Sequence, residues 1–230
     1  MRDGENAIVI DAGTGVARFI EHPELLSGTT RLDILLTHFH LDHIAGLAYL
    51  PALGLCEQTT IWGPGKLLYG TPTRTLLDHV SREPFHPVPL ERQDIEVRDI
   101  PAGETELGGV RITHRRQDRH SAPSLGFRFG DALTWITDTA YDPDSASFAA
   151  ESEVLAHEAW CTEDSPRNRE IHSSASQAAE VAARASVRQL ALIHLPPFEQ
   201  SIEPLVEEAQ ASVPGAAAAI DGLSLAELTV

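Results

Sequence analysis

A histidine-rich loop between a buried strand and a helix constrains this chain more than any other feature. Residues 37–43 read THFHLDH, which places four possible metal ligands within six residues. The run LDILL (32–36) before the loop favours a buried strand, and residues 44–50 after it favour a helix that ends before Pro51. A strand-loop-helix junction holds side chains at a sheet edge, and imidazole with carboxylate suits zinc and similar divalent ions. The loop therefore predicts a metal site rather than a turn that is rich in histidine by chance.

The sequence THFHLDH resembles the signature loop of the metallo-β-lactamase fold hydrolases, whose members hold one or two metal ions between two αβ layers. The resemblance implies an α/β fold, a four-layer αβ/βα sandwich, in a single domain over residues 1–230. DAGTG (11–15) resembles a second sequence element of the family. This resemblance implies that Asp11 stabilises the metal loop by hydrogen bonding rather than by binding the metal itself. Family members carry about two further strands before this turn, so either the true start lies upstream of Met1 or the protein has lost an edge hairpin. In the second case the sheet lacks its first N-terminal strands, and we expect a second subunit to cover the bare edge in a homodimer.

Later segments resemble the remaining ligand segments of the family. HSAPSLGFR (120–128) is similar to the third ligand segment of the ribonuclease Z-like branch, and His114, which lies in an expected strand, is the rival for that role. Asp138 follows the apolar run LTWIT, where the family has a metal-bridging aspartate. His194 follows LALI, where the family has its last ligand. The resemblance thus implies one ion held by His38, His40 and His120, a second held by Asp42, His43 and His194, and Asp138 between the two.

A pair of ions in such a site would lower the pKa of a shared water towards about 7 and stabilise charge on a phosphoryl or acyl centre. Zinc is the expected metal, with manganese or iron as alternatives, and Asp42 is expected to orient the water as well.

The segments HEA (157–159) and HSS (172–174) resemble the ribonuclease Z region that supplies a Glu–His pair. This implies that Glu158 aligns His172 and that His172 gives a proton to the leaving oxygen.

Local patterns predict helices over residues 16–27 and 74–80, and an alanine-rich helix that begins at a capping box formed by Ser174 and Gln177. The remaining histidines match no motif, and we expect them to be solvated or structural: His22, His79, His86 and His157.

Charge and composition exclude several functional classes. Acidic residues outnumber basic ones by 34 to 17, so the formal net charge is −17, and such a surface repels polyanions. The only dense basic cluster either recruits a phosphate or is a solvated loop; it consists of Arg111, Arg115, Arg116 and Arg119. The polar N-terminus, the absence of a long apolar run and the presence of only two cysteines favour a cytoplasmic protein that does not associate with a membrane.

Departures from the ribonuclease Z pattern limit the expected substrate. No Gly- and Lys-rich arm lies between Trp62 and His120, and LPPF (195–198) stands where the family shows S-x-R-Y. We therefore predict a dinuclear metal-dependent hydrolase, a phosphodiesterase that acts on a small or cyclic nucleotide-type diester rather than on nucleic acid. One alternative is a tRNA 3′-processing endoribonuclease that binds RNA through the arginine cluster. Another is a metal-stabilised binding protein without turnover.

Overall fold

The computed structural model describes residues 1–52, 56–86, 88–197 and 201–222. The chain forms two compact units, Met1–Val110 and Arg111–Val230, and each contains strands of a β-sheet together with helices. The α/β class predicted from the sequence is therefore confirmed, while the assignment of the whole chain to a single domain stays a prediction.

The sheet of the first unit has five strands in the order β1-β2-β3-β4-β5. β1 is antiparallel to β2, and all the other neighbours are parallel. β1 is only two residues long, so one short edge strand precedes the strand that the sequence indicated. Cover of this edge by a second subunit stays a prediction. The strands are β1 (Arg2–Asp3), β2 (Asn6–Ile10), β3 (Arg31–Leu35), β4 (Gln58–Gly63) and β5 (Glu96–Asp99).

The helices of the first unit are short. They are η1 (Thr14–Ala17), α1 (Arg18–Glu21), η2 (Pro23–Leu26), α2 (Leu41–Ile44), η3 (Ala45–Ala52), α3 (Gly65–Tyr69), α4 (Thr73–Val80) and η4 (Leu90–Arg92), where η marks a 3₁₀ helix. Its core packs apolar residues of β3 and β4 against these helices, including Leu32, Ile34, Ile61, Leu47 and Leu77. The burial of β3 agrees with its place inside a parallel sheet.

Two sequence predictions for this unit were wrong in detail. Residues 16–27 do not form one helix, because His22 leaves helical geometry (φ −128°, ψ 68°) and Pro23 follows it. The helix after the metal loop does not end before Pro51. It continues as 3₁₀ helix η3 through Ala52, and Pro51 removes one backbone donor in its last turn. The helix predicted over 74–80 is confirmed as α4.

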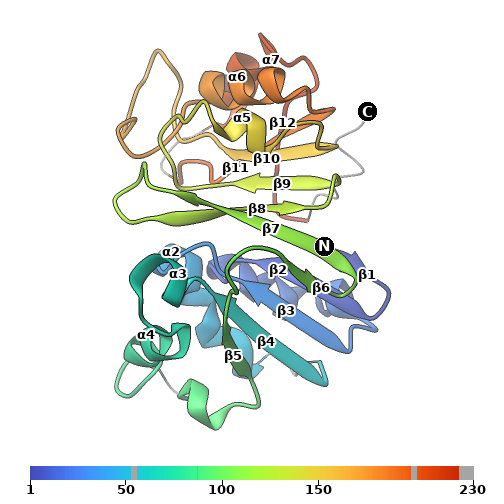
Figure 1. Ribbon diagram of the computed structural model, residues 1–230, viewed down its shortest axis with the longest axis vertical. Helices are drawn as coiled ribbons and strands as arrows, with labels where there is room; N and C mark the ends of the chain where they lie inside the picture. The colour runs from blue at the N-terminus through green and yellow to red at the C-terminus, as the bar shows by residue number, and fades with distance from the viewer. Residues whose placement is uncertain (53–55, 87, 198–200, 223–230) are drawn as a thin grey trace. The chain divides into compact units, whose positions relative to one another are not determined.

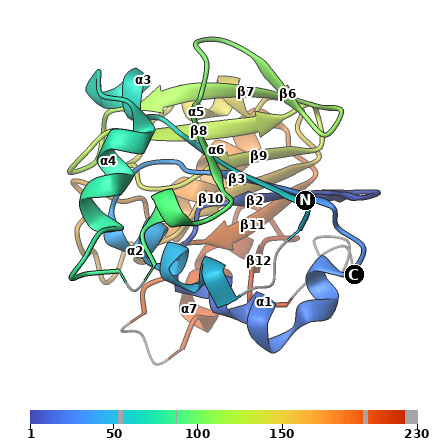
Figure 2. The same cartoon turned by 90° about the horizontal axis from the view of Figure 1, so that it is seen from below.

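The second sheet has seven strands in the order β12-β11-β10-β9-β8-β7-β6, and the run from β7 to β12 can be followed in Figure 2. β7, β8 and β9 are antiparallel neighbours, and β9 to β12 are parallel. The strands are β6 (Thr105–Leu107), β7 (Val110–Gln117), β8 (Ser124–Phe129), β9 (Leu133–Ile136), β10 (Val154–Glu158), β11 (Gln189–Ile193) and β12 (Ala217–Ala218).

Three helices lie along one face of β9, β10 and β11 (Figure 1), namely α5 (Ser145–Phe148), α6 (Ala175–Ala185) and α7 (Glu203–Gln210). The capping box predicted for α6 is confirmed, since Ser174 accepts from the Gln177 backbone and Gln177 accepts from the Ser174 backbone. The face of α6 that carries small side chains is buried against β10 and β11. This packing fixes the position of the segment just before the helix, where His172 lies. No helix among the described residues is long and apolar enough to cross a membrane.

Candidate metal centre

The first unit carries four of the predicted ligands on the loop between β3 and α2. His38 and His43 are buried, His40 is half-buried and Asp42 is exposed. The ring of His38 lies 4.4 Å from that of His40 and 4.3 Å from that of His43, centroid to centroid. Three imidazoles at this spacing would repel one another if all were protonated. The cluster therefore suits neutral rings that share a cation.

Asp11 braces this loop, as the family resemblance implied. Its carboxylate accepts hydrogen bonds from the Thr37 backbone at 2.7 Å and from the Thr37 hydroxyl at 2.9 Å. It also lies 2.7 Å from Nδ1 of His43. A carboxylate that accepts from Nδ1–H fixes the tautomer of the ring, so Nε2 is the nitrogen of His43 that can bind a metal.

Two glycines let the Asp11 turn and the metal loop pack backbone against backbone. The Ala12 amide donates to the His43 carbonyl at 2.7 Å, and the Gly46 amide donates to the Ala12 carbonyl at 2.7 Å. A Cβ on Gly46 would lie 2.0 Å from the Gly13 carbonyl oxygen, and a Cβ on Gly13 would lie 2.3 Å from the Asp42 carbonyl oxygen. Only glycine fits at either position, which explains the first glycine of DAGTG and the glycine three residues after the loop.

The second unit brings Asp138 together with two histidines. Oδ1 of Asp138 lies 3.4 Å from Nε2 of His120, and Oδ2 lies 3.6 Å from Nε2 of His194. Two ligand atoms bound to one tetrahedral zinc at about 2.0–2.2 Å are roughly 3.3–3.6 Å apart. Each carboxylate oxygen of Asp138 therefore pairs with a different histidine at the spacing of two ligands on one ion. This spacing suits a carboxylate that binds metal together with both histidines.

Three of the residues described above adopt left-handed backbone conformations that favour glycine. The φ angles are +59° for Asp11, +52° for Asp138 and +47° for His194, and only three other non-glycine residues among those described share this feature. Each of the three lies one or two residues beyond the end of β2, β9 or β11. Such conformations are unfavourable by about 1–3 kcal/mol and cluster at functional sites, where the surrounding fold enforces them.

Glu158 and His172 form the pair that the sequence predicted. Nδ1 of His172 lies 2.7 Å from Oε2 of Glu158, and Oε1 accepts from the Thr139 backbone at 2.7 Å. Burial raises the pKa of Glu158, but the hydrogen bonds that its carboxylate accepts from His172 and His194 lower it by more. The net pKa is below the ordinary value, so this fully buried carboxylate is an anion at neutral pH.

Of the two histidines that the sequence offered as the third ligand, His120 is the one that lies beside Asp138. His114 lies within β7 opposite Phe127. His120 follows β7, and its Nδ1 lies 2.9 Å from the Ile171 carbonyl oxygen, which directs Nε2 towards Asp138.

Sequence reasoning missed Trp160. Its indole stacks on His172 (4.6 Å between ring centroids, 18° between planes) and on His194 (5.1 Å, 28°). Its position two residues after Glu158 was the one signal that could have indicated it. A flat indole against both imidazoles restricts the rotation of each ring and limits the access of water to them.

The structure also offers a second role for His172. Possible ligand atoms of Asp138, His172 and His194 all lie within 4.8 Å of one another. His172 is therefore placed either to bind an ion or to exchange a proton beside it, and the two roles make different predictions for the metal content of a variant.

The other histidines outside the motifs differ from one another. His22 is partly exposed beside Glu24, and His157 is buried with Nδ1 near the Glu158 carbonyl oxygen. His86 is buried, and neither of its two ring nitrogens has a hydrogen-bond partner among the described residues.

The arginine cluster is engaged within its own unit. Arg116 pairs with Asp118 at 2.7 Å, and Arg119 donates to the Tyr141 carbonyl at 3.0 Å. Arg115 donates to the Asp142 carboxylate and to the Ser145 hydroxyl. These partners compete with any phosphate for the same donors.

Comparison with known proteins identifies the family. Residues 6–195 match the family described as "Beta-lactamase superfamily domain". The chain belongs to this superfamily. An uncharacterized protein of Mycobacterium leprae is 29% identical over 213 residues, which cover 90% of this chain and 73% of that protein. A protein named Ribonuclease Z from Mycobacterium sp. (strain KMS) is 32% identical over 223 residues, which cover 86% of this chain and 77% of the relative.

Solved structures of superfamily members share the fold. The metallo-β-lactamase fold protein YhfI from Bacillus subtilis superposes with a TM-score of 0.76 over 96% of this chain and 88% of its own, at 20% identity. A diphosphatase from the PhnP family superposes with a TM-score of 0.70 over 97% of this chain and 80% of its own, at 21% identity. The predicted metallo-β-lactamase fold and the ribonuclease Z-like resemblance are thus confirmed. The chain has the fold of a superfamily of metal-dependent hydrolases, and its His and Asp groups can hold a divalent metal.

Proposed function

We propose that this protein is a dinuclear metal-dependent phosphodiesterase that hydrolyses a small or cyclic nucleotide-type phosphodiester. The observation that carries the proposal is the geometry of Asp138, whose two oxygens pair with His120 and His194 at 3.4 and 3.6 Å. Each oxygen lies beside a different histidine, which supports a carboxylate shared by two ions. Two ions suit the attacking and leaving oxygens of phosphoryl displacement.

The ligand set in this proposal is the one that the family resemblance implies. His38, His40 and His120 would hold one ion, Asp42, His43 and His194 the other, and Asp138 both. Imidazole and carboxylate ligands favour Zn²⁺, and they also accept Mn²⁺ or iron. When bound, two such ions supply an acidified water and neutralise charge that develops on the phosphoryl group.

The residues of the chain supply the proton chemistry. The Glu158 anion holds Nδ1–H of His172 and stabilises the imidazolium form of the ring. In that form Nε2 also carries a proton, which it gives to the leaving oxygen, and His172 is left as the neutral imidazole with its proton on Nδ1. Trp160 keeps the His172 ring in this orientation by stacking on it. Asp42 is exposed, which suits a second task as the acceptor that orients the attacking water. A positioned proton donor contributes about 10²–10⁴ in rate.

The substrate class is argued from charge and from the sequence beyond the last ligand. A net charge of −17 opposes binding of a long polyanion, and the basic cluster already has internal partners. Leu195, Pro196 and Pro197 offer no cation after His194, and Phe198 lies outside the described residues. A small diester needs neither an extended basic surface nor an RNA-binding arm.

The test is a measurement of metal content combined with a diester screen. We expect about two zinc, manganese or iron ions per chain, and hydrolysis of bis(p-nitrophenyl) phosphate and of cyclic nucleotides that stops after chelation and returns with added metal. A protein that holds two ions yet cleaves none of these esters would refute the phosphodiesterase. It would favour a metal-stabilised binding protein instead. The expected homodimer belongs to the same proposal and is tested by the mass in solution.

Ribonuclease Z activity is the second candidate, and the 32% identity to a protein of that name favours it. It predicts cleavage of precursor tRNA at its 3′ side. It also predicts that a double charge reversal in the cluster, Arg116→Glu with Arg119→Glu, abolishes that cleavage while small diesters are still hydrolysed.

A further inference from the structure

Two buried polar side chains close the base of the loop that carries His120. β7 ends at Gln117 and β8 begins at Ser124, and these two residues lie opposite each other in the antiparallel pair. Gln117 is only 2% exposed and Ser124 is fully buried. Nε2 of Gln117 donates to the Ser124 hydroxyl at 2.8 Å. This pair therefore fixes where the loop with His120 leaves the sheet and returns to it.

The same two side chains hold the backbone just beyond the end of β9. Nε2 of Gln117 donates to the Thr137 carbonyl at 2.7 Å. The Ser124 hydroxyl lies 3.1 Å from the carbonyl oxygen of Asp138 and 3.3 Å from that of Thr137, and it donates its hydrogen between them. The pairing of β8 with β9 ends at Trp135, so these two carbonyls lie beyond the strand ladder. Side chains thus satisfy the backbone acceptors that the ladder no longer reaches.

Asp138 depends on this support because its backbone is left-handed, with φ at +52°. Its carboxylate is held separately, since the Thr137 hydroxyl donates to Oδ2 at 2.7 Å. Both the carbonyl and the carboxylate of Asp138 are therefore fixed by groups of the second unit. A shift of either would move Oδ1 relative to Nε2 of His120, which lies 3.4 Å away.

The Gln117 side chain also carries an unfavourable feature. Its Oε1 is buried and has no hydrogen-bond partner among the described residues, which destabilises the fold. Gly126 leaves the room that this atom needs, because a Cβ there would lie 2.8 Å from Oε1. A methionine would fill a similar space without a buried acceptor. What the glutamine adds is the pair of hydrogen bonds from Nε2.

We propose that Gln117 and Ser124 are positioning residues of the metal centre, which hold His120 and Asp138 at the spacing of ligands before an ion binds. This inference rests on the proposed function, because it concerns two of the ligands in that proposal. Groups that orient a ligand without touching the metal typically change metal affinity by about 10–100-fold. A centre that is already in place loses less conformational freedom when the ion arrives.

The test measures the zinc affinity of the variant Gln117→Met by competition with a chromophoric chelator. We expect an affinity lower by about tenfold or more, and a shift of the visible absorption bands when cobalt replaces zinc, because those bands report the ligand geometry. Thr134→Val is the matched control on β9, since it removes a buried hydrogen bond of 2.7 Å between Thr134 and Ser152. It should lower the urea midpoint of the metal-free protein about as much as Gln117→Met does. Its zinc affinity and cobalt spectrum should match those of the wild type.

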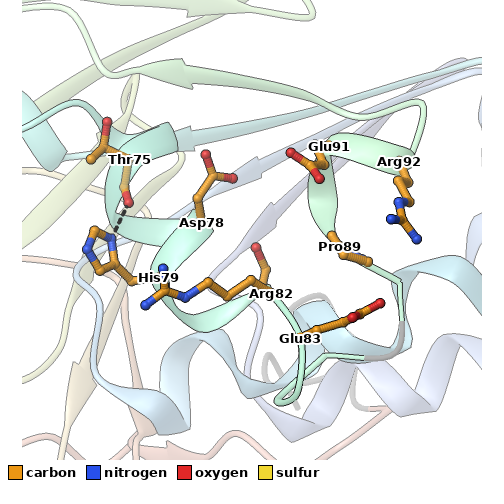
Figure 3. Close-up of a pocket in the computed structure, with 9 residues that line it drawn as sticks. Thr75, Asp78, His79, Arg82, Glu83, Pro89, Glu91 and Arg92 are labelled. Atoms are coloured by element: carbon orange, nitrogen blue, oxygen red, sulfur yellow. Dashed lines mark hydrogen bonds between the residues drawn. The ribbon is translucent and has the colours of Figure 1, made fainter.

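A second control tests whether the zinc that is measured lies in the proposed centre. His79 is exposed in the first unit and lines a pocket of about 510 Å³, where its Nδ1 donates to the Thr75 carbonyl at 2.6 Å (Figure 3). His79→Gln removes a histidine that belongs to no candidate ligand group, so we expect an unchanged affinity. A loss as large as that of Gln117→Met would place the zinc elsewhere and overturn the inference.

The outcomes separate this inference from the proposed function. An unchanged affinity in Gln117→Met, or a loss that Thr134→Val shares, overturns the positioning role and leaves the phosphodiesterase in place if diesters are hydrolysed. A selective loss of affinity in a protein that hydrolyses no diester supports the positioning role and refutes the phosphodiesterase alone. A wild type that binds no metal overturns both. If Gln117→Met does not fold, Ser124→Ala is judged by the same comparison, because it removes the donor to the Asp138 carbonyl and leaves Gln117 in place.

Discussion

Asp11 and His43 are 32 residues apart in the chain, and Oδ2 of Asp11 lies 2.7 Å from Nδ1 of His43. The same carboxylate holds the backbone and the hydroxyl of Thr37, so one side chain fixes both ends of the metal loop. The carboxyl end of β2 therefore controls the geometry of ligands that follow β3.

Replacing Asp11 should weaken metal binding without removing a ligand. We expect Asp11→Asn to lower metal affinity by about 10–100-fold, because the amide cannot accept from both Thr37 and His43 as a carboxylate does. Competition with a chromophoric chelator measures the affinity. An unchanged affinity would show that the loop holds its shape without this brace.

Replacing Asp138 should affect both ions at once. Asp138→Asn keeps the volume and removes the charge, and we expect the metal content to fall from about two ions per chain to one or none, with loss of hydrolysis. Elemental analysis of the purified variant gives the count. Two ions retained at full occupancy would contradict the bridging role.

His172→Gln distinguishes a proton donor from a metal ligand. If His172 donates a proton, metal content stays the same and kcat falls by about 10²–10⁴ with little change in KM. The loss should be smaller for p-nitrophenyl esters, whose leaving group needs no proton, than for alkyl esters. A variant that loses an ion instead would assign His172 to the metal, beside Asp138 and His194.

Gly46→Ala should destabilise the fold itself. A Cβ at this position would lie 2.0 Å from the Gly13 carbonyl oxygen, and backbone atoms on both sides leave it no room. We expect a loss of roughly 3 kcal/mol in the free energy of unfolding, measured by urea denaturation of the metal-free protein. Gly15→Ala is the matched control, since a Cβ there meets nothing within 4 Å. Equal stability of the two variants would show that the turn and the loop can move apart.

The features that the sequence predicted well are local ones. The capping box of α6 depends on Ser174 and Gln177, three residues apart, and the ligands of the metal loop lie within six residues. The extent of the helices was predicted less well. His22 and Pro23 interrupt the helix expected over 16–27, and η3 passes through Pro51, because helix ends depend on the packing of each turn as well as on residue type.

By itself the sequence determined the superfamily, the α/β class and the identity of the candidate ligands, since spacing between neighbouring residues records which side chains share a strand end or a loop. Only the tertiary structure decided which oxygen of Asp138 faces His120 and which faces His194, and that Trp160 stacks on His172. These relationships join residues from separate strands and loops. Hydrogen-bond partners and buried surfaces of that kind are set by the packing of distant segments, and no periodicity along the chain records them.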